Sequence, residues 1–341
     1  MRALVAVVAF FAFLAPLTQR AGAQLDLPRP LAQLQATLRS AGAVAPGRAA
    51  FEIRDLATGY TSGYNANAVM PAASTIKIPI MVEVFRQMAA GNFDLNRRVE
   101  LMSSDRDWGS GDLASSPIGS TFPVSSLLTQ MITVSDNTAA NMLIRLVGRK
   151  NINATMANLG LDHTHLAGYI RTEEWSVRTS LRTTPADMVK LLSGMAQKQL
   201  IDAWSSQQMI AILEQQEINT LLPEPLPQIP IAHKTGSFDD TLNDVGIVYA
   251  DEPYVIAVMT TNLPSLPAGR NFIRRISKVA YTHLVQFAKW RELNGQPAPA
   301  LAPGAAAPAP PADPQSDTDT QQDVPMWGAS PAPASTPTAS P

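Results

Sequence analysis

The chain has 341 residues, and 45% of them are hydrophobic, which is enough to bury the core of one large domain or two medium ones. Its formal net charge of −2 gives no electrostatic footprint for nucleic acid, so we expect no such partner. Because the chain contains no cysteine, structural disulfides, thiolate metal sites and a lipidated N-terminal cysteine are excluded.

Residues 1–23 have the pattern of a secretory signal peptide. Arg2 precedes an apolar run over 3–17, and Ala21-Gly22-Ala23 follows as a small-x-small cleavage site. The apolar run is short for a membrane span. We therefore expect export to the periplasm or the medium, a mature chain that begins near Gln24, and no stable membrane anchor after cleavage. An uncleaved anchor is the alternative.

Strands are predicted near both ends of the chain, with helical patterns between them. The predicted elements are, in order, a helix over 31–38, strands over 49–55 and 60–65, helices within 75–213, strands over 231–235, 244–250 and 254–260, and a helix over 269–290. This order predicts an α/β (α+β) fold, with an antiparallel sheet built from both chain ends, flanked by helices, and an inserted all-helical lobe. A ligand site is expected in the cleft between the lobes.

The C-terminal segment differs in composition from the rest of the chain. From residue 296 onward Pro, Ala, Ser and Thr dominate, and such a segment cannot bury enough surface to offset its ordering entropy. We therefore expect a folded domain over 24–294 and a disordered Pro/Ala-rich tail over 295–341.

Three short strings indicate the chemistry: Ser74-Thr75-Ile76-Lys77, Ser135-Asp136-Asn137 and Lys234-Thr235-Gly236. Each string alone is weak, because S-x-x-K occurs on solvated helices, S-D-N at helix N-caps and K-T-G in loops. Their joint presence in this order, each in a plausible structural setting, favours an acyl-transfer site built on serine.

The spacing around the first string predicts that Ser74 lies in the first turn of a helix whose apolar face carries Ile76, Ile80, Val84 and Met88. The N-terminus of a helix favours negative charge that develops on the Ser74 oxygen. The amine of Lys77 is then within reach of Ser74, and burial beside the cation of Lys234 would lower the pKa of Lys77. Pro79 is expected to strain this helix.

These motifs resemble those of the penicillin-recognising serine enzymes, specifically the class A β-lactamase-like branch. The similarity covers roughly 31–294 and includes the runs 109–111, 131–132, 184–188 and 243–248. It implies an exported, monomeric serine β-lactamase that hydrolyses the β-lactam amide through a Ser74 acyl-enzyme, without cofactor or metal. A cell-wall D,D-peptidase and a low-turnover penicillin- or muropeptide-binding protein are the alternatives. The expected partner is a small-molecule β-lactam or a peptidoglycan-derived peptide.

The resemblance also implies a role for each catalytic residue. Ser74 is the nucleophile and Lys77 its base. Ser135 relays a proton toward the leaving nitrogen, and Lys234 holds Ser135 electrostatically. Backbone N–H groups of Ser74 and Ser237 are expected to form the oxyanion hole, which is usually the largest electrostatic contribution in such sites.

Further residues are expected to bind the substrate. By the resemblance, Asn137 binds the substrate's side-chain amide, and Thr235, with the neighbouring Gly236 and Ser237, grips its carboxylate. Trp108 could stack on the substrate, although plain packing is the alternative.

The chain departs from the family pattern after the S-D-N string. Class A β-lactamases carry an E-x-x-L-N loop whose glutamate activates the water that frees the acylated serine. No such string occurs here, and the position of that glutamate falls near Tyr169 or Ile170. Glu173 and Glu174 follow and are either the deacylation base or solvated loop carboxylates. We therefore expect slow deacylation.

A second departure follows the K-T-G string. Residues 238–244 contain three aspartates and no arginine, whereas many class A enzymes place a basic residue there for the substrate carboxylate. We expect that Arg270, Arg274 or Arg275 could substitute.

Other candidate sites are weaker. His163 and His165 could bind a metal as a pair, but we expect them to be surface loop histidines. We expect His233 to pack along its strand rather than to perform chemistry. Asp105 and Asp107 hint at a calcium loop but lack the glycine and glutamate positions of an EF-hand.

Overall fold

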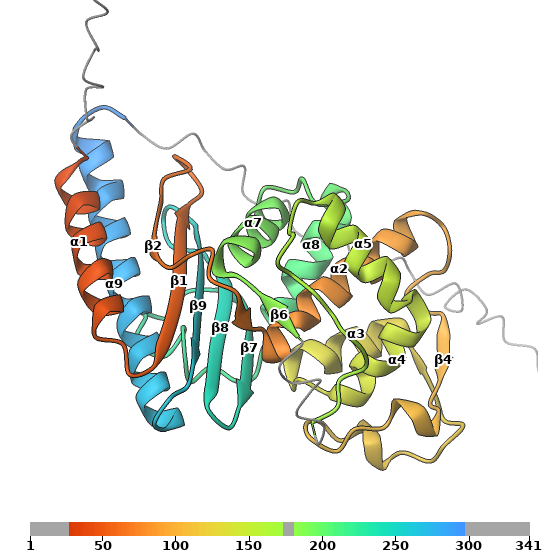
Figure 1. The fold of residues 1–341 in the computed structure, drawn as a ribbon. Helices are drawn as coiled ribbons and strands as arrows, with labels where there is room; N and C mark the ends of the chain where they lie inside the picture. Colours follow the sequence, from red (N-terminus) through yellow and green to blue (C-terminus); the bar gives the residue numbers. More distant parts are fainter. Residues whose placement is uncertain (1–26, 173–180, 297–341) are drawn as a thin grey trace, which may run out of the picture. The chain divides into compact units, whose positions relative to one another are not determined.

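The computed structural model describes residues 27–172 and 181–296. The predicted signal peptide, nearly all of the predicted tail, Glu173 and Glu174 lie outside these ranges. Within them, a five-stranded antiparallel sheet has the strand order β2-β1-β9-β8-β7. Its strands are β1 (Arg48–Asp55), β2 (Thr61–Tyr64), β7 (Ile231–Phe238), β8 (Thr241–Val248) and β9 (Tyr254–Thr261). The predicted sheet, assembled from both ends of the domain, is confirmed (Figure 1).

Helices cover both faces of this sheet. α1 (Arg29–Ala43) and α9 (Leu266–Leu293) lie side by side along one face, and α7 (Pro185–Ala196) packs on the other (Figure 1). β1 shows the alternation that this arrangement requires, because Ala49, Phe51 and Ile53 belong to the core beneath α1 and α9, while Ala50, between Ala49 and Phe51, packs with a different cluster.

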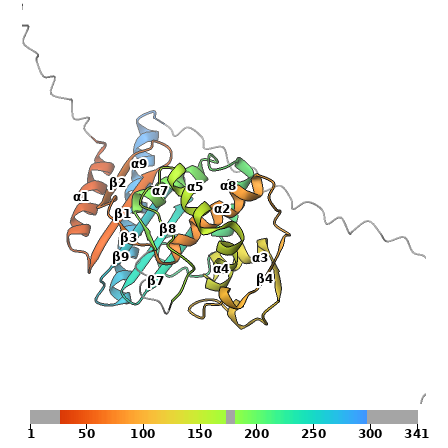
Figure 2. The same ribbon diagram turned by 45° about the vertical axis from the view of Figure 1, so that its right-hand side comes forward.

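The second lobe is inserted between β2 and β7 and is mostly helical. Its helices are α2 (Lys77–Ala89), α3 (Val124–Thr133), α4 (Asn137–Val147), α5 (Arg149–Asn158) and α8 (Ala203–Leu213). Nearly every residue of α2 is buried, as expected of a helix that other elements surround. Figure 2 shows this lobe beside β7, the edge strand of the sheet.

Short strands add to the predicted all-helical lobe. β4 (Arg98–Glu100) pairs with β5 (Thr121–Pro123), and β3 (Met70–Pro71) pairs with β6 (Arg182–Thr183) at the junction with the sheet. Strands of two or three residues are too short for alternating hydrophobicity to reveal them.

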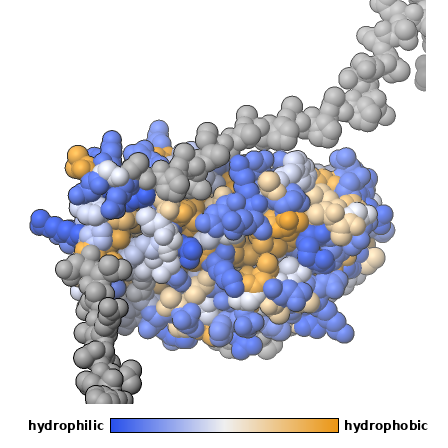
Figure 3. Space-filling view, turned by 90° about the horizontal axis from the view of Figure 1, so that it is seen from above, coloured by the Kyte–Doolittle hydropathy of each residue, from blue (hydrophilic) through white to orange (hydrophobic). Residues whose placement is uncertain are grey.

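Among residues 27–172 and 181–296, no helix combines the length and apolar character needed to cross a bilayer. The face seen in Figure 3 is largely hydrophilic, with apolar residues in patches between polar ones, as is usual for folded proteins.

Candidate active site

Ser74 lies in a tight turn rather than in an α-helix. Residues Ala73–Ile76 form a 3₁₀ helix, and α2 begins directly after it at Lys77. Ala73 has a φ of 48°, a left-handed conformation that is uncommon for a residue other than glycine and that concentrates at functional sites. Pro79 is the third residue of α2, where the backbone N–H has no partner within the helix, so the expected strain does not arise.

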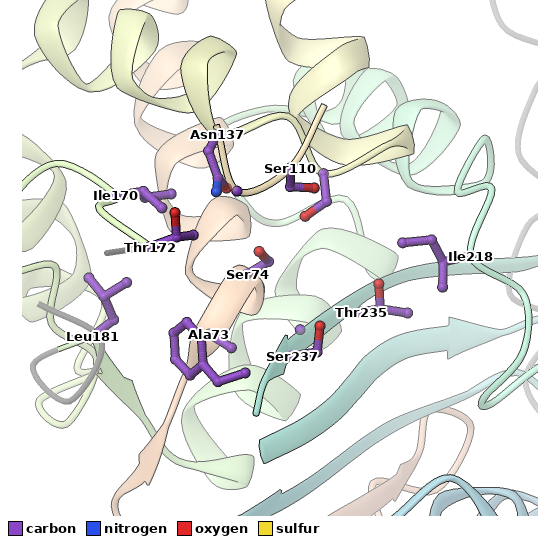
Figure 4. Close-up of a pocket in the computed structure, with 14 residues that line it drawn as sticks. Ala73, Ser74, Ser110, Asn137, Ile170, Thr172, Leu181, Ile218, Thr235 and Ser237 are labelled. Atoms are coloured by element: carbon purple, nitrogen blue, oxygen red, sulfur yellow. The ribbon is translucent and has the colours of Figure 1, made fainter. Parts of the chain in front are cut away.

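Strand β7 approaches this turn closely because Gly236 has no side chain. A Cβ atom at Gly236 would lie 3.0 Å from the Ala72 carbonyl oxygen and 3.0 Å from the Ser74 nitrogen. Thr235, Gly236 and Ser237 line one side of a cavity whose floor carries Ser74 (Figure 4). The K-T-G glycine therefore sets the distance between the edge strand and the nucleophile turn.

The S-D-N string joins α3 to α4. Ser135 has a φ of 62°, a second left-handed residue at the cavity. Asp136 caps α4, since its Oδ1 accepts a hydrogen bond from the Ala139 nitrogen at 2.8 Å, and its Oδ2 accepts one from the Leu113 nitrogen at 2.9 Å. The aspartate of the motif is therefore structural, and it holds Ser135 and Asn137 against the cavity.

Lys77 connects the first string to the second. Its Nζ donates to the Ser135 carbonyl oxygen, to Ser135 Oγ at 3.0 Å and to Asn137 Oδ1 at 2.6 Å. The Ser74 hydroxyl, which points into the cavity in Figure 4, makes no hydrogen bond with any described residue. The expected reach from Lys77 to Ser74 is therefore not a hydrogen bond in this state, as is common in catalytic sites without substrate.

Two lysines without any solvent exposure stand beside the nucleophile. Burial, followed by the charge of Lys234, lowers the pKa of Lys77 well below its usual range. Burial also lowers the pKa of Lys234 to about 7, against the opposing charge of Asp244. Lys234 Nζ donates to the Thr235 carbonyl oxygen at 3.0 Å, and within the described ranges no hydrogen bond joins it to Ser135. A neutral Lys77 would donate only two of its three hydrogen bonds, and its lone pair can then accept a proton from serine.

The opposite wall of the cavity is formed by the segment that ends at Thr172. Asn141 holds this segment through both backbone groups of Ile170: its Oδ1 accepts from the Ile170 nitrogen at 2.7 Å, and its Nδ2 donates to the Ile170 oxygen at 3.0 Å. Ile170, Thr172 and Leu181 line the cavity (Figure 4). Tyr169 is not part of this lining and lies against Arg171. Of the two positions counted from the sequence, Ile170 is therefore the one at the cavity.

Several predicted residues lie away from the cavity lining. Trp108 is 67% exposed and contacts the guanidinium of Arg106, so stacking on a substrate remains a prediction. Arg274 donates to the Thr220 oxygen at 3.0 Å and pairs with Glu224 at 3.3 Å. The described cavity lining contains no arginine, so the expected substitution by a basic residue of α9 is not seen in this lining.

His233 is structural in this fold. His233 is buried, with Nδ1 at 2.9 Å from Asp244 Oδ1 and Nε2 at 3.0 Å from Asn219 Oδ1. No group of three or more His, Cys, Asp or Glu suited to a metal ion occurs within the described ranges.

Sequence reasoning missed several residues of the site, most of which lie in loops. The additional residues of the cavity lining are Ala73, Gly109, Ser110, Thr172, Leu181, Ile218 and Phe238. Asp107 and Asn141, which are buried behind this lining, were also missed as parts of the site. Only the run 109–111 gave a signal, through its place in the family resemblance.

Comparisons with known proteins agree with this geometry. The model of a family described as the beta-lactamase enzyme family matches residues 32–284. A solved beta-lactamase from Sphaerobacter thermophilus is 31% identical, with a TM-score of 0.68, and the match covers 73% of this chain and 95% of that one. PBP-A is 29% identical, with a TM-score of 0.71 and coverage of 76% and 98%. A variant of PBP-A, solved as an acyl-enzyme complex with penicillin G, has the same identity and TM-score.

The family match spans most of the chain, and the strings that suggested the family meet at one cavity around a serine with a buried lysine beside it. The chain therefore belongs to the beta-lactamase enzyme family, among the penicillin-recognising serine enzymes.

Proposed function

We propose that this protein is an exported class A-type serine hydrolase that opens β-lactams through a Ser74 acyl-enzyme and releases the product slowly. The observation that carries the proposal is the pair of contacts from buried Lys77 to Ser135 Oγ and Asn137 Oδ1 beside Ser74. Export rests on the sequence pattern of residues 1–23.

The contact between Lys77 and Ser135 supports the second half of the proton route during acylation, and the first transfer requires Ser74 and Lys77 to come within hydrogen-bond distance. Neutral Lys77 takes the proton of the Ser74 hydroxyl as its oxygen attacks the β-lactam carbonyl carbon. Backbone N–H groups of Ser74 and Ser237 stabilise the oxyanion. The proton then passes from Lys77 to Ser135, whose Oγ lies 3.0 Å away, and Ser135 protonates the ring nitrogen as the C–N bond breaks. The product is an ester on Ser74, and Lys77 is neutral again.

Release of that ester requires a water molecule and a base. The cavity wall that Asn141 holds in place presents the aliphatic side chain of Ile170, which cannot accept a proton. We therefore propose that hydrolysis of the acyl-enzyme limits turnover, with Glu173 and Glu174 as candidate bases from outside the described ranges.

The cavity wall lined by Ile170, Thr172 and Leu181, which we call the apolar wall, also favours a second candidate function. A protein whose Ser74 is acylated readily but releases the acyl group slowly to water would act as a penicillin- or muropeptide-binding protein. It could equally act as a cell-wall D,D-peptidase with another acyl acceptor. The similarity to PBP-A supports this alternative as much as the similarity to the Sphaerobacter enzyme supports the first.

Two measurements on the purified protein separate these functions. Intact-protein mass spectrometry after incubation with benzylpenicillin should show one adduct, which Ser74→Ala removes. Hydrolysis of a chromogenic cephalosporin should show a burst of product equal to the enzyme concentration, then a slow steady rate. A burst with no measurable steady rate would favour the binding protein. Absence of both an adduct and hydrolysis in the wild type would rule out the acyl-enzyme.

A further inference from the structure

The carboxylate of Asp107 joins three segments that line the cavity. Asp107 is only 6% exposed. Its Oδ1 accepts from Asn137 Nδ2 at 2.8 Å and from the Gly109 nitrogen at 3.0 Å, and its Oδ2 accepts from the Thr172 nitrogen at 2.8 Å. The Thr172 hydroxyl lies 3.1 and 3.2 Å from the two oxygens. Gly109, Asn137 and Thr172 line the cavity, whereas Asp107 does not, so it acts through them.

The first consequence concerns the amide of Asn137. Its Oδ1 faces Lys77 Nζ, and its Nδ2 faces Asp107, so each end of the amide has a partner of opposite polarity. An amide nitrogen carries two hydrogens, and Asp107 engages one of them. The second remains for a carbonyl oxygen of a substrate in the cavity. Asp107 thus fixes which end of the amide a substrate meets.

The second consequence concerns the separation of the cavity walls. A Cβ atom on Gly109 would lie 2.2 Å from Thr172 Cγ2, so the two loops touch directly at this point. Asp107 bridges the same loops by charge-assisted hydrogen bonds, which are about twice as strong as neutral ones. No described residue forms an ion pair with it, so the buried charge is compensated mainly by these donors.

We propose that Asp107 is a positioning residue for this site: it orients the Asn137 amide toward Lys77 and the substrate and holds the Thr172 segment at the opposite wall. Its loss should therefore reduce acylation most for substrates that carry a side-chain amide. This inference rests on the proposed acylation of Ser74.

The test compares two penicillins on matched variants. Benzylpenicillin carries a side-chain amide, and 6-aminopenicillanic acid, the bare nucleus, lacks it. Asp107→Asn should lower the acylation rate for benzylpenicillin about 10- to 100-fold and that for the bare nucleus much less. Asp187→Asn is the control, because Asp187 is also buried, at 7% exposure, and accepts from the His163 nitrogen and the Thr164 hydroxyl away from the cavity lining. In Asp187→Asn, the ratio of the acylation rates for the two penicillins should stay within about twofold of the wild-type ratio.

A pH profile separates positioning from general loss of structure. Lys234, Asp136 and Asp107 are the charges that act on Lys77, and the two carboxylates raise its pKa. Asp107→Asn removes one of these carboxylates, so the pKa of Lys77 should fall further. The pH at which the acylation rate rises should therefore move to a lower value. Asp107→Glu keeps the negative charge but displaces it. This variant should therefore lose the preference for the penicillin with a side-chain amide, while the pH at which the acylation rate rises should shift less than in Asp107→Asn. This second variant also serves if Asp107→Asn does not fold.

The outcomes are distinct. If Asp107→Asn and Asp107→Glu both fold and keep the wild-type ratio of acylation rates for the two penicillins and the wild-type pH dependence of acylation, the positioning role is overturned. The proposed acyl-enzyme would be unaffected by that result. A wild type that forms no Ser74 adduct would overturn the proposed function, and this inference with it.

Discussion

The two walls of the cavity have opposite chemical character. Around Ser74 the wall holds two buried lysines with lowered pKa values, and one of them, Lys77, donates hydrogen bonds to the Ser135 hydroxyl and the Asn137 carboxamide. Across the cavity the wall is formed by Ile170, Thr172 and Leu181, none of which titrates near neutral pH. Forming an acyl-enzyme and hydrolysing it need different groups, so one cavity can be equipped for the first step and poorly equipped for the second.

The largest expected effect comes from a substitution in the wall around Ser74. Lys77→Ala should slow acylation by a penicillin about 10²- to 10⁴-fold, because it removes the proposed general base. Stopped-flow kinetics or timed mass spectrometry would measure this, and a thermal melt would check the fold. Lys190→Ala, which removes an exposed lysine, is the control. A reduction of less than about threefold in Lys77→Ala would mean that another group activates Ser74.

Ile170→Glu should convert the apolar wall into one that can activate water. Because Asn141 holds the backbone at this position and the side chain faces the cavity, a carboxylate there should speed deacylation about 10- to 100-fold. The measurement is the decay of the penicillin adduct. Ile218→Glu places a carboxylate on another part of the cavity lining. Equal acceleration in both variants would show that position 170 has no special place in hydrolysis.

A pH effect of about tenfold should report on Lys234. Its pKa of about 7 lies below the usual value, so the amine is charged below pH 7 and loses its charge as the pH rises. If that charge attracts the substrate carboxylate, kcat/KM for acylation by a penicillin should fall about tenfold between pH 6 and pH 8. A penicillin methyl ester has no carboxylate and should not show the fall. The same fall with the ester would assign it to another group.

The smallest effect is expected at the two glutamates that follow Thr172. Glu173→Gln and Glu174→Gln should each change the deacylation rate by less than about threefold if both are solvated loop carboxylates. A loss of about 10²-fold or more in one variant, with acylation unchanged, would identify that residue as the base and show that the apolar wall is supplemented from the neighbouring loop.

Local pattern was sufficient for most of the fold. Alternation and helical spacing located the five strands of the main sheet and both helices on its outer face, with ends that differ by a few residues, because these signals repeat along the chain. Pattern did not distinguish the 3₁₀ turn at Ser74 from the start of an α-helix. That turn depends on Ala73 in a left-handed conformation and on the approach of Gly236.

The sequence by itself determined which residues could do chemistry, since S-x-x-K, S-D-N and K-T-G occur together and in order. Only the tertiary structure decided which groups touch. Lys77 reaches Ser135 and Asn137 across 58 and 60 residues, and Asp107 reaches Thr172 across 65. It also decided that Ile170 rather than Tyr169 faces the cavity, because Asn141 fixes that loop. Loops have no repeating pattern, so their paths depend on such distant hydrogen bonds.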